Sequence, residues 1–331
     1  MKNLKKSTKS NLVTYAILII GFILMTYMSL TGGASRQLKS LLVPICVNII
    51  LAVSLNLVIG FLGELSLGHA GFMSVGAYAG CLFSIYLKDI LPSSLRFPLA
   101  LLVGGIVAGI FGLIVGIPVL RLKGDYLAIV TLAFGEIIRS VIINLNFTGG
   151  ASGLKGTPQD SNFNWAFAMV IITVFVIMNL VDSKHGRAIM ALRDNSIAAK
   201  SVGVSANNYK LMTFVISAFF AGVAGVLYGH NFSIMTAGTF DYNKSIEILV
   251  IVVLGGMGNI RGSVLSAIII TVLPEMLRPL QDYRMLIYAV VLITMMLLGS
   301  SEKFMLLRYK LSPTRFIKKQ LARRQKIKED N

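Results

Sequence analysis

Residues 97–120 read FPLALLVGGIVAGIFGLIVGIPVL and contain no Asp, Glu, Lys or Arg. An apolar stretch of about 20 residues is long enough, as a helix, to cross a hydrocarbon core about 30 Å thick. This stretch therefore predicts a helix that spans a membrane. The number of similar stretches elsewhere in the chain decides the class of protein.

The same charge-poor pattern recurs along the chain. Ten stretches predict membrane spans, near residues 11–30, 40–60, 66–87, 97–120, 126–145, 164–181, 209–228, 246–259, 263–280 and 285–300. We therefore expect an all-α polytopic membrane protein, a helical bundle of about ten transmembrane helices. The 331 residues are 55% apolar and 14% charged, whereas soluble domains carry about 25% charged residues. A soluble enzyme, a secreted disulfide scaffold and a disordered chain are excluded.

The basic residues predict the orientation of these spans, because Lys and Arg that flank spans stay on the cytoplasmic side. Residues 1–10 and 301–331 are both rich in Lys and Arg. We expect both termini to be cytoplasmic, on either side of a membrane domain of residues 11–300. Alternating the loops places 22 of the 31 basic residues inside. This distribution accounts for the net charge of +17, so we expect contact with membrane lipid and none with nucleic acid.

Two connections between predicted spans are longer than a turn. Residues 146–163 form a polar, glycine-rich loop that the charge count places outside. Residues 182–208 are polar but periodic, and the count places them inside. Within them, Leu192, Ile197, Ala198 and Val202 predict the apolar stripe of one short amphipathic helix. The helix is too short to span, so we expect it to dock on a cytoplasmic partner.

Ionisable side chains at membrane depth are expensive, at about 2.5–3.5 kcal/mol each near the bilayer centre. They must therefore face a partner or a water-filled path. Glu136 and Arg139 lie three residues apart, a spacing that allows an ion pair on one helix face. The residues of this kind are Glu64, His69, Glu136, Arg139, Glu247 and Glu275. Each has either a structural role or a place along a translocation path.

Glycines concentrate in residues 60–80 and 254–262, next to ionisable groups. Helices interrupted at such positions expose backbone groups, which is tolerated where they line a cavity or pack on protein. We therefore expect these two stretches, with Gly68, Gly255 and Gly256, to line the path. The alternative is close helix packing, which also explains the G-x-x-x-G pairs at Gly76–Gly80, Gly105–Gly109, Gly112–Gly116 and Gly225–Gly229.

The chain lacks the motifs of an enzyme acting alone. It contains no G-x-x-x-x-G-K-[ST] phosphate loop and no H-E-x-x-H zinc motif. Cys46 and Cys81 both lie in apolar spans and read as small buried residues. We expect no catalytic residue, no bound metal and no cofactor.

Four strings, in order, resemble one family. They are GFLGELSLGHAGFMSVGAYAG at 60–80, LRLKGDYLAIVTLAFGEIIR at 120–139, TGGASG at 148–153 and LGGMGNIRG at 254–262. The chain is similar over about residues 40–300 to the LivM-type permease subunits of ABC importers for branched-chain amino acids. The resemblance implies a prokaryotic cytoplasmic membrane, a LivH-type partner permease, two ABC ATPase subunits and an extracytoplasmic substrate-binding protein. It also implies alternating access driven by ATP hydrolysis in the partner subunits.

The cytoplasmic segment carries part of the resemblance. ABC import permeases have a pattern E-A-A-x-x-x-G that docks into the ATPase, and residues 197–203 keep Ala198, Ala199 and Gly203 but have isoleucine for the glutamate. By this resemblance residues 182–208 are the coupling segment, and Gly203 ends its helix. Arg187, Arg193 and Asp194 are the candidates for charged contacts.

Other functions stay open at this point. A permease of the same superfamily could carry urea, a sugar or a nucleoside. An ion-coupled secondary transporter would use Glu136, Glu247 and Glu275 directly. A purely structural membrane protein is disfavoured by the ionisable residues at membrane depth.

Overall fold

The structure is a computed structural model that describes residues 36–122 and 124–277, with residues 283, 286–287, 289–290 and 293–294. The predicted span 11–30, both basic terminal segments and most of the predicted span 285–300 lie outside the described residues. Two compact units divide the chain, one up to Val272 and one from Leu273 onward. The description below concerns the first unit, except that the last residues of its final helix belong to the second.

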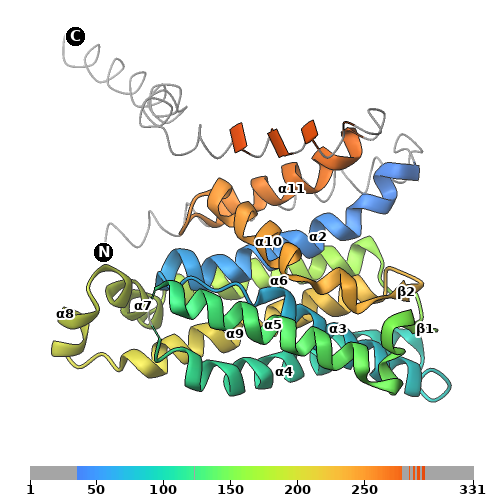
Figure 1. Ribbon diagram of the computed structural model, residues 1–331, viewed down its shortest axis with the longest axis horizontal. Coiled ribbons are helices and arrows are strands. Elements are labelled where there is room, and N and C mark those ends of the chain that lie inside the picture. Colours follow the sequence, from blue (N-terminus) through green and yellow to red (C-terminus); the bar gives the residue numbers. More distant parts are fainter. Residues whose placement is uncertain are drawn as a thin grey trace, which may run out of the picture. The chain divides into compact units, whose positions relative to one another are not determined.

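The described residues are almost entirely helical (Figure 1). In chain order the elements are α2 (Arg36–Asn56), η1 (Leu57–Leu62), α3 (His69–Tyr86), α4 (Ser93–Val119), α5 (Asp125–Asn144), η2 (Asn146–Thr148), η3 (Gly150–Ser152), β1 (Leu154–Lys155), α6 (Phe163–Asp182), α7 (Lys184–Asp194), α8 (Ser196–Ser201), α9 (Ala206–Gly229), β2 (Ile234–Met235), η4 (Ala237–Phe240), α10 (Tyr242–Gly255) and α11 (Ile260–Met276).

Five of these helical segments are long and apolar enough to cross a membrane. They are Ser40–Leu62, Ser93–Val119, Asp125–Asn144, Phe163–Asp182 and Ala206–Gly229. Three more predicted spans also form helices, and α3, α10 and α11 have 18, 14 and 17 residues. The prediction of a helical polytopic membrane protein is confirmed.

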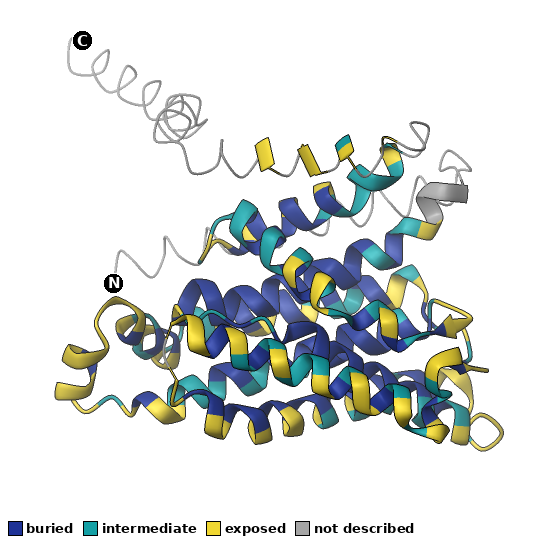
Figure 2. Cartoon of the chain, viewed as in Figure 1, coloured by how far each residue is buried: buried dark blue, intermediate teal, exposed yellow. Residues whose placement is uncertain are grey.

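Burial is uneven among the helices (Figure 2). The most apolar part of Ser40–Leu62 is 94% buried inside the chain, whereas that of α5 is only 22% buried. Side chains on the outer faces of α4 and α5 are large and apolar, for example Ile106, Ile114 and Ile129. Among the described residues α2 and η1 are therefore central, and α5 leaves most of its surface uncovered.

Glycines let α3, α4 and α9 pack with their backbones in contact. A Cβ added to Gly76 of α3 would collide with the backbone of Gly222 in α9, and one added to Gly225 would collide with the carbonyl of Met73. A Cβ on Gly104 of α4 would lie 2.6 Å from the carbonyl oxygen of Gly76. Small residues replace the missing hydrophobic drive between helices in lipid by allowing close van der Waals contact. The packing interpretation of Gly76 and Gly225 agrees with this geometry.

The loops gather at two ends of the unit, as the alternating topology requires. At one end, here called the coupling end, lie α7 and α8 (Figure 1, left), and Arg193 in the last turn of α7 donates to the carbonyl of Gly60 in η1. At the opposite end, here called the loop end, β1 pairs antiparallel with β2 (Figure 1, right), so residues 146–163 meet the connection after α9. The hydroxyl of Tyr78 also donates to the carbonyl of Met235 there.

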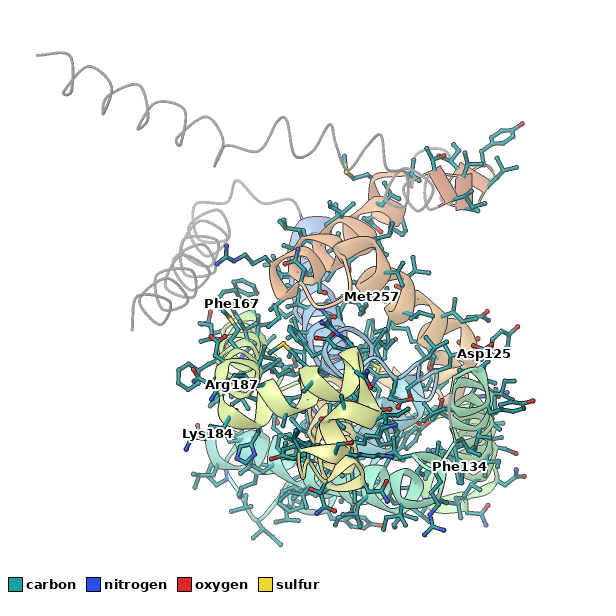
Figure 3. All side chains as sticks on the ribbon, turned by 90° about the vertical axis from the view of Figure 1, so that its left-hand side faces the viewer. Asp125, Phe134, Phe167, Lys184, Arg187 and Met257 are labelled. Atoms are coloured by element: carbon teal, nitrogen blue, oxygen red, sulfur yellow. The ribbon has the colours of Figure 1, made fainter. Side chains whose placement is uncertain are left out.

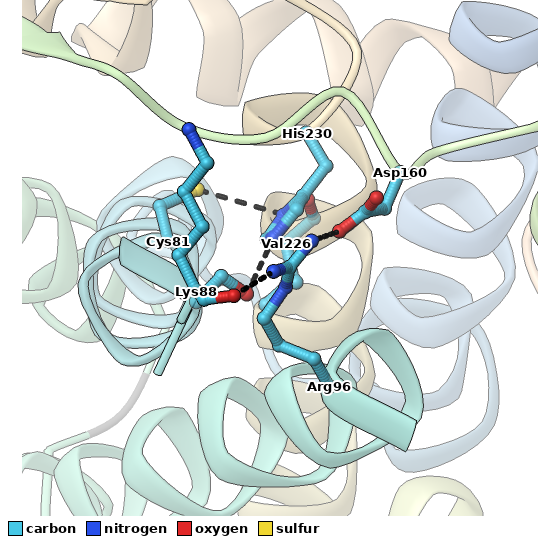
Figure 4. Close-up of polar contacts among 7 residues, drawn as sticks. Cys81, Lys88, Arg96, Asp160, Val226 and His230 are labelled. Carbon is cyan, nitrogen blue, oxygen red and sulfur yellow. Dashed lines mark hydrogen bonds and ion pairs between the residues drawn. The ribbon is translucent and has the colours of Figure 1, made fainter. Parts of the chain in front are cut away.

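A buried charged cluster holds the loop end together (Figure 4). The guanidinium of Arg96 lies 2.6 Å from the carboxylate of Asp160 and donates to the carbonyl of Lys88 at 3.2 Å. Next to it, the buried His230 ring bonds to the hydroxyl of Ser84 at 2.8 Å. Because the Arg96 side chain is only 7% exposed, its ion pair fixes the 146–163 loop to the start of α4.

We expect Gly222→Leu to disrupt the bundle. The new side chain would overlap Gly104 and Ala108 of α4, and overpacking of a tight core costs about 3 kcal/mol. The measurements are the yield of folded protein in detergent and its melting temperature. Gly238→Ala is the matched control, because an added Cβ there meets nothing within 4 Å. Equal melting temperatures for the two variants would contradict the role of glycine in this packing.

Candidate functional site

The first glycine-dense stretch is a helix break. α2 continues into the π-helix η1, which ends where Gly63 takes a left-handed φ of 81°. Residues 63–68 are not helical, and α3 begins at His69. π-helical turns inside long helices are rare and occur often at functional sites. A helix break therefore lies within the glycine-dense residues 60–80.

The second glycine-dense stretch is also a helix break. α10 ends at Gly255, and α11 begins at Ile260. Between them Gly256 and Gly258 have φ values of 91° and 78°, which glycine adopts without the penalty that other residues pay. A Cβ on Gly255 would lie 2.5 Å from the amide nitrogen of Ser263. Both the backbone conformation and the close approach therefore require small residues in this turn.

The buried side chain of Asn56 joins the two breaks. Asn56 accepts a hydrogen bond from the amide of Gly258 at 2.8 Å and donates to the hydroxyl of Ser263 at 2.9 Å. The space beside Gly60, where a Cβ would stand, is filled by the Asn56 side chain and the Gly258 backbone. The two stretches, about 200 residues apart in sequence, thus form one site at the coupling end.

The start of α3 is packed rather than open. His69 is buried, and its Nε2 lies 3.0 Å from the hydroxyl of Ser54. A Cβ on Gly68 would lie 2.7 Å from the carbonyl oxygen of Thr131 in α5. The amide of Ala70 donates to the hydroxyl of Ser245 in α10 at 3.1 Å. Gly68 therefore has a packing reason to be glycine, and His69 has a buried hydrogen-bond partner.

A second set of charged residues lies between α5 and α10. Glu136 and Arg139 form the ion pair expected from their spacing, at 2.8 Å, with side chains 28% and 32% exposed. Glu136 also accepts a hydrogen bond from the amide of Tyr242, the first residue of α10, at 3.0 Å. Glu247 pairs with Lys244 at 3.1 Å. We call the surface formed by Glu136, Arg139, Lys244 and Glu247 the α5–α10 face.

This face continues into the central helix through amide and hydroxyl groups. Lys244 also donates to the side-chain oxygen of Asn48 at 3.1 Å, and Asn48 donates to the hydroxyl of Thr271 at 2.8 Å. Neither Asn48 nor Asn56 is predicted from the sequence, because neutral amides are not among the ionisable residues or glycines expected at a path. The sequence does contain an indication of them, because they are two polar amide side chains within the otherwise apolar residues 40–60.

The coupling segment differs from the single amphipathic helix that the sequence predicted. It forms two helices, α7 and α8, because the Asn195 side chain accepts hydrogen bonds from the amides of Ile197 and Ala198 and so caps a new helix. The predicted apolar stripe is split between opposite sides. Leu192 is buried with Ala199, whereas Ile197 and Val202 are 78% and 81% exposed.

The end of α8 agrees with the predicted role of Gly203. Gly203 has a φ of 87°, and its amide donates to the carbonyl of Lys200, while the amide of Val204 donates to that of Ala199. This pair of bonds is the Schellman arrangement, which ends helices at glycine. Ala199 packs with Leu192, Val204 and other residues of its own chain, so Ala198 alone of the two alanines faces outward.

The charged residues of α7 point in different directions. Arg187 is exposed beside the C-terminal end of α6 (Figure 3), and its guanidinium donates to the carbonyl of Asp182 at 3.4 Å. Arg193 bonds to Asp194 at 3.0 Å and also reaches inward, donating to the carbonyl of Gly60 at 2.9 Å. Arg193 therefore contacts the first helix break, a contact that its sequence pattern does not predict.

A further ion pair binds the same break. The ammonium of Lys210, near the start of α9, contacts the carboxylate of Glu64, and both side chains are about 15% exposed. Glu64 is one of the ionisable residues expected at membrane depth, whereas the sequence predicts no particular contact for Lys210. Its position at the edge of a predicted span gave no indication of its partner.

The chain matches a family model described as branched-chain amino acid transport system / permease component over residues 37–299. It is 36% identical to the high-affinity branched-chain amino acid transport system permease protein LivM of Escherichia coli, over 76% of this chain and 66% of that protein. It thus spans slightly less than two thirds of that relative's length.

More distant relatives carry two kinds of names. A probable branched-chain amino acid transport permease protein LivM of Methanocaldococcus jannaschii is 26% identical over 66% of this chain and 75% of that protein. The ribose import permease protein RbsC of Haemophilus influenzae is 28% identical over 76% of this chain and 81% of that protein. No solved structure matches the chain with statistical significance. Because the family model covers most of the chain, including both helix breaks and the coupling segment, the chain belongs to the family of branched-chain amino acid transport system permease components.

Proposed function

We propose that the chain is a transmembrane permease subunit of an ABC importer that moves branched-chain amino acids across a prokaryotic cytoplasmic membrane. Two separate ABC ATPase subunits hydrolyse the ATP, an LivH-type permease is the second membrane subunit, and an extracytoplasmic binding protein delivers the substrate. The observation that carries the proposal is the arrangement at the coupling end. The short helix α8, with Ile197 and Ala198 exposed, adjoins α7, which bonds directly to the first helix break through Arg193 and reaches the second through Asn56.

The translocation path runs along the α5–α10 face. Glu136 lies near the middle of α5, about 12 Å from its C-terminal end at the usual helical rise of 1.5 Å per residue. A charged pair that is about 30% exposed at this depth cannot face hydrocarbon without a large cost. The face is therefore covered by water or by the partner permease, and substrate passes there.

Two apolar hollows on the chain suit lipid and not this substrate. One of about 790 Å³ lies between α4, α6 and α9, with walls such as Leu102, Ile106 and Phe219. Another of about 380 Å³ lies against α3, α4 and α5, with walls such as Phe111 and Ile137. An amino acid carries an ammonium and a carboxylate, and an apolar wall leaves both without partners. The hollows do not compete with the α5–α10 face as a path.

The docking surface for an ATPase subunit is the exposed side of α7 and α8. Ile197, Ala198 and Val202 form its apolar part, and Arg187 and Asp194 form its charged part. The glutamate of the family pattern is replaced by Ile197, so this contact is more apolar than the pattern suggests. Gly203 acts indirectly, because its left-handed conformation ends α8 and sets the direction of the chain toward α9.

Uptake into a strain lacking its own branched-chain amino acid importer tests the proposal. We expect the chain, expressed with its three kinds of partner subunit, to restore uptake of labelled leucine, isoleucine or valine, and an ATPase-inactive complex to restore none. Labelled ribose and urea are the comparison substrates, since a relative is named as a ribose permease. Uptake of ribose in place of the amino acids would reassign the cargo, and uptake without ATP hydrolysis would favour an ion-coupled transporter.

We expect Val202→Glu to weaken binding of the ATPase subunits by at least about tenfold, because burial of an unpaired carboxylate at the contact is unfavourable. Binding of the purified ATPase to the detergent-solubilised permease pair measures the effect. Ile234→Glu is the control, because Ile234 is a similarly apolar, exposed residue at the loop end. If Val202→Glu binds the ATPase as tightly as the control does, the docking surface lies elsewhere.

The proposed orientation places the loop end outside and the coupling end and both termini inside. A cysteine replacing exposed Ser152 should react with a membrane-impermeant maleimide added to intact cells, and one replacing Ser196 should react only after lysis. Ser161, although in the same outer loop, is buried and is a poor labelling site. The native Cys46 and Cys81 are buried, which keeps the background low. The reverse labelling pattern would overturn the orientation.

A further inference from the structure

Residues 60–64, at the start of the first helix break, contact the coupling segment and the helix that follows it, α9. Arg193 of α7 donates to the carbonyl of Gly60 at 2.9 Å. Its side chain also covers Gly63, where an added Cβ would lie 2.6 Å from the Arg193 Cγ atom. Lys210 of α9 forms an ion pair with Glu64. Two cationic side chains thus bind residues 60–64, one by a hydrogen bond and one by an ion pair.

The hydrogen bond from Arg193 gives a partner to a backbone carbonyl at the end of η1. The last carbonyls of any helix have no partner within that helix, and a buried carbonyl without a partner is costly. Gly60 lies in the final turn of η1 and is buried. Arg193 supplies the donor, and its two bonds to Asp194, at 3.1 and 3.0 Å, keep the guanidinium oriented.

The same contacts reach the second break through Asn56. Its amide binds the Gly258 backbone and Ser263, and the Arg193 guanidinium lies 3.6 Å from the position of an added Cβ on Gly258. The chain of contacts from α7 therefore passes through Gly60 and Asn56 to the turn between α10 and α11. α10 in turn carries Lys244 and Glu247 of the α5–α10 face.

We propose that Arg193 is the positioning residue that transmits movement of the coupling segment to both helix breaks, with the Lys210–Glu64 ion pair as a second attachment. When an ATPase displaces α7, the Gly60 carbonyl moves with it, and Asn56 moves the Gly258 turn in the same direction. Arg193 thus acts on the inside of the chain rather than in the charged contact with the ATPase first expected from the sequence. The inference rests on the proposed function, which supplies the force on α7.

The test uses the full importer, with both permeases, both ATPases and the binding protein, reconstituted in proteoliposomes. We expect Arg193→Ala to lower substrate uptake about tenfold while ATP hydrolysis stays within about twofold, because one link between otherwise intact sites is removed. Arg193→Lys should retain part of the uptake, since an ammonium can still donate to the Gly60 carbonyl. Lys184→Ala, which removes an exposed charge from the same helix, is the control for general loss of charge.

A second readout follows the break directly and does not depend on the identity of the cargo. Leu65→Cys places a thiol in the half-buried, non-helical residues after η1. Its labelling rate should differ between nucleotide-free and ATP-trapped complexes in the otherwise unchanged chain and in Lys184→Ala. In Arg193→Ala the difference should disappear. A complex that imports no amino acid but keeps this difference would refute the proposed cargo and leave the link intact.

The ion pair is tested by charge reversal, which also serves if Arg193→Ala fails to assemble. Glu64→Lys and Lys210→Glu should each reduce uptake and the nucleotide-dependent labelling, and the double variant should recover both. Three results would overturn the proposal. They are an unchanged labelling difference in Arg193→Ala, equal loss in Arg193→Lys and Arg193→Ala, and no recovery in the charge-reversed double variant.

Discussion

A helix can stop inside a membrane domain only where other groups satisfy its free backbone donors and acceptors. Lipid offers none, so each break must be covered by side chains or must line water. In this chain two side chains satisfy these backbone groups. Asn56 accepts a hydrogen bond from the Gly258 amide, and Arg193 donates one to the Gly60 carbonyl. The same constraint fixes where α10 and α11 can be interrupted, and it brings two distant stretches of sequence to one place.

Close packing of glycines and these polar contacts depend on one another. The backbones of α3, α4 and α9 touch at Gly76, Gly104 and Gly222, which makes a rigid block. The end of α2, just before η1, is attached to this block by the hydroxyl of Ser217 in α9, which donates to the carbonyl of Ser54 at 2.6 Å. The block of α3, α4 and α9 resists movement because its helices touch along their backbones. The turns at Gly63 and at Gly256–Gly258 lie beside it, and glycine backbones there can bend more easily. Asn56 and Arg193, the residues proposed to link the breaks, lie at the boundary between them.

Much of the architecture could be predicted from the sequence because membrane constraints are simple. Span length, absence of charge and the alternation of basic loops predicted the helices and grouped the loops at two ends. The partners of individual side chains could not be predicted in the same way. Lys210 and Glu64 lie 146 residues apart, and no local pattern links them, whereas the Glu136–Arg139 pair is local and was found.

The split of the coupling segment shows why a periodic pattern was insufficient there. Leu192 and Val202 fit one helical stripe only if the helix is continuous, and the Asn195 cap interrupts it. After the interruption the axis turns, so residues of one stripe face opposite ways. Capping by asparagine is readable from sequence, but its effect on helix direction depends on the packing of Leu192 and Ala199 against α9.

The charges along the proposed path are consistent with a zwitterionic cargo. Glu136 is paired with Arg139, and Glu247 with Lys244, so the α5–α10 face offers both signs in equal number. An isolated charge would attract one end of an amino acid and repel the other. A face of paired charges can exchange its internal partners briefly for the ammonium and the carboxylate of the substrate. If the substrate passes along this proposed path, each exchange replaces one ion pair with another, so the free energy along the path would stay nearly level and tight binding would be avoided.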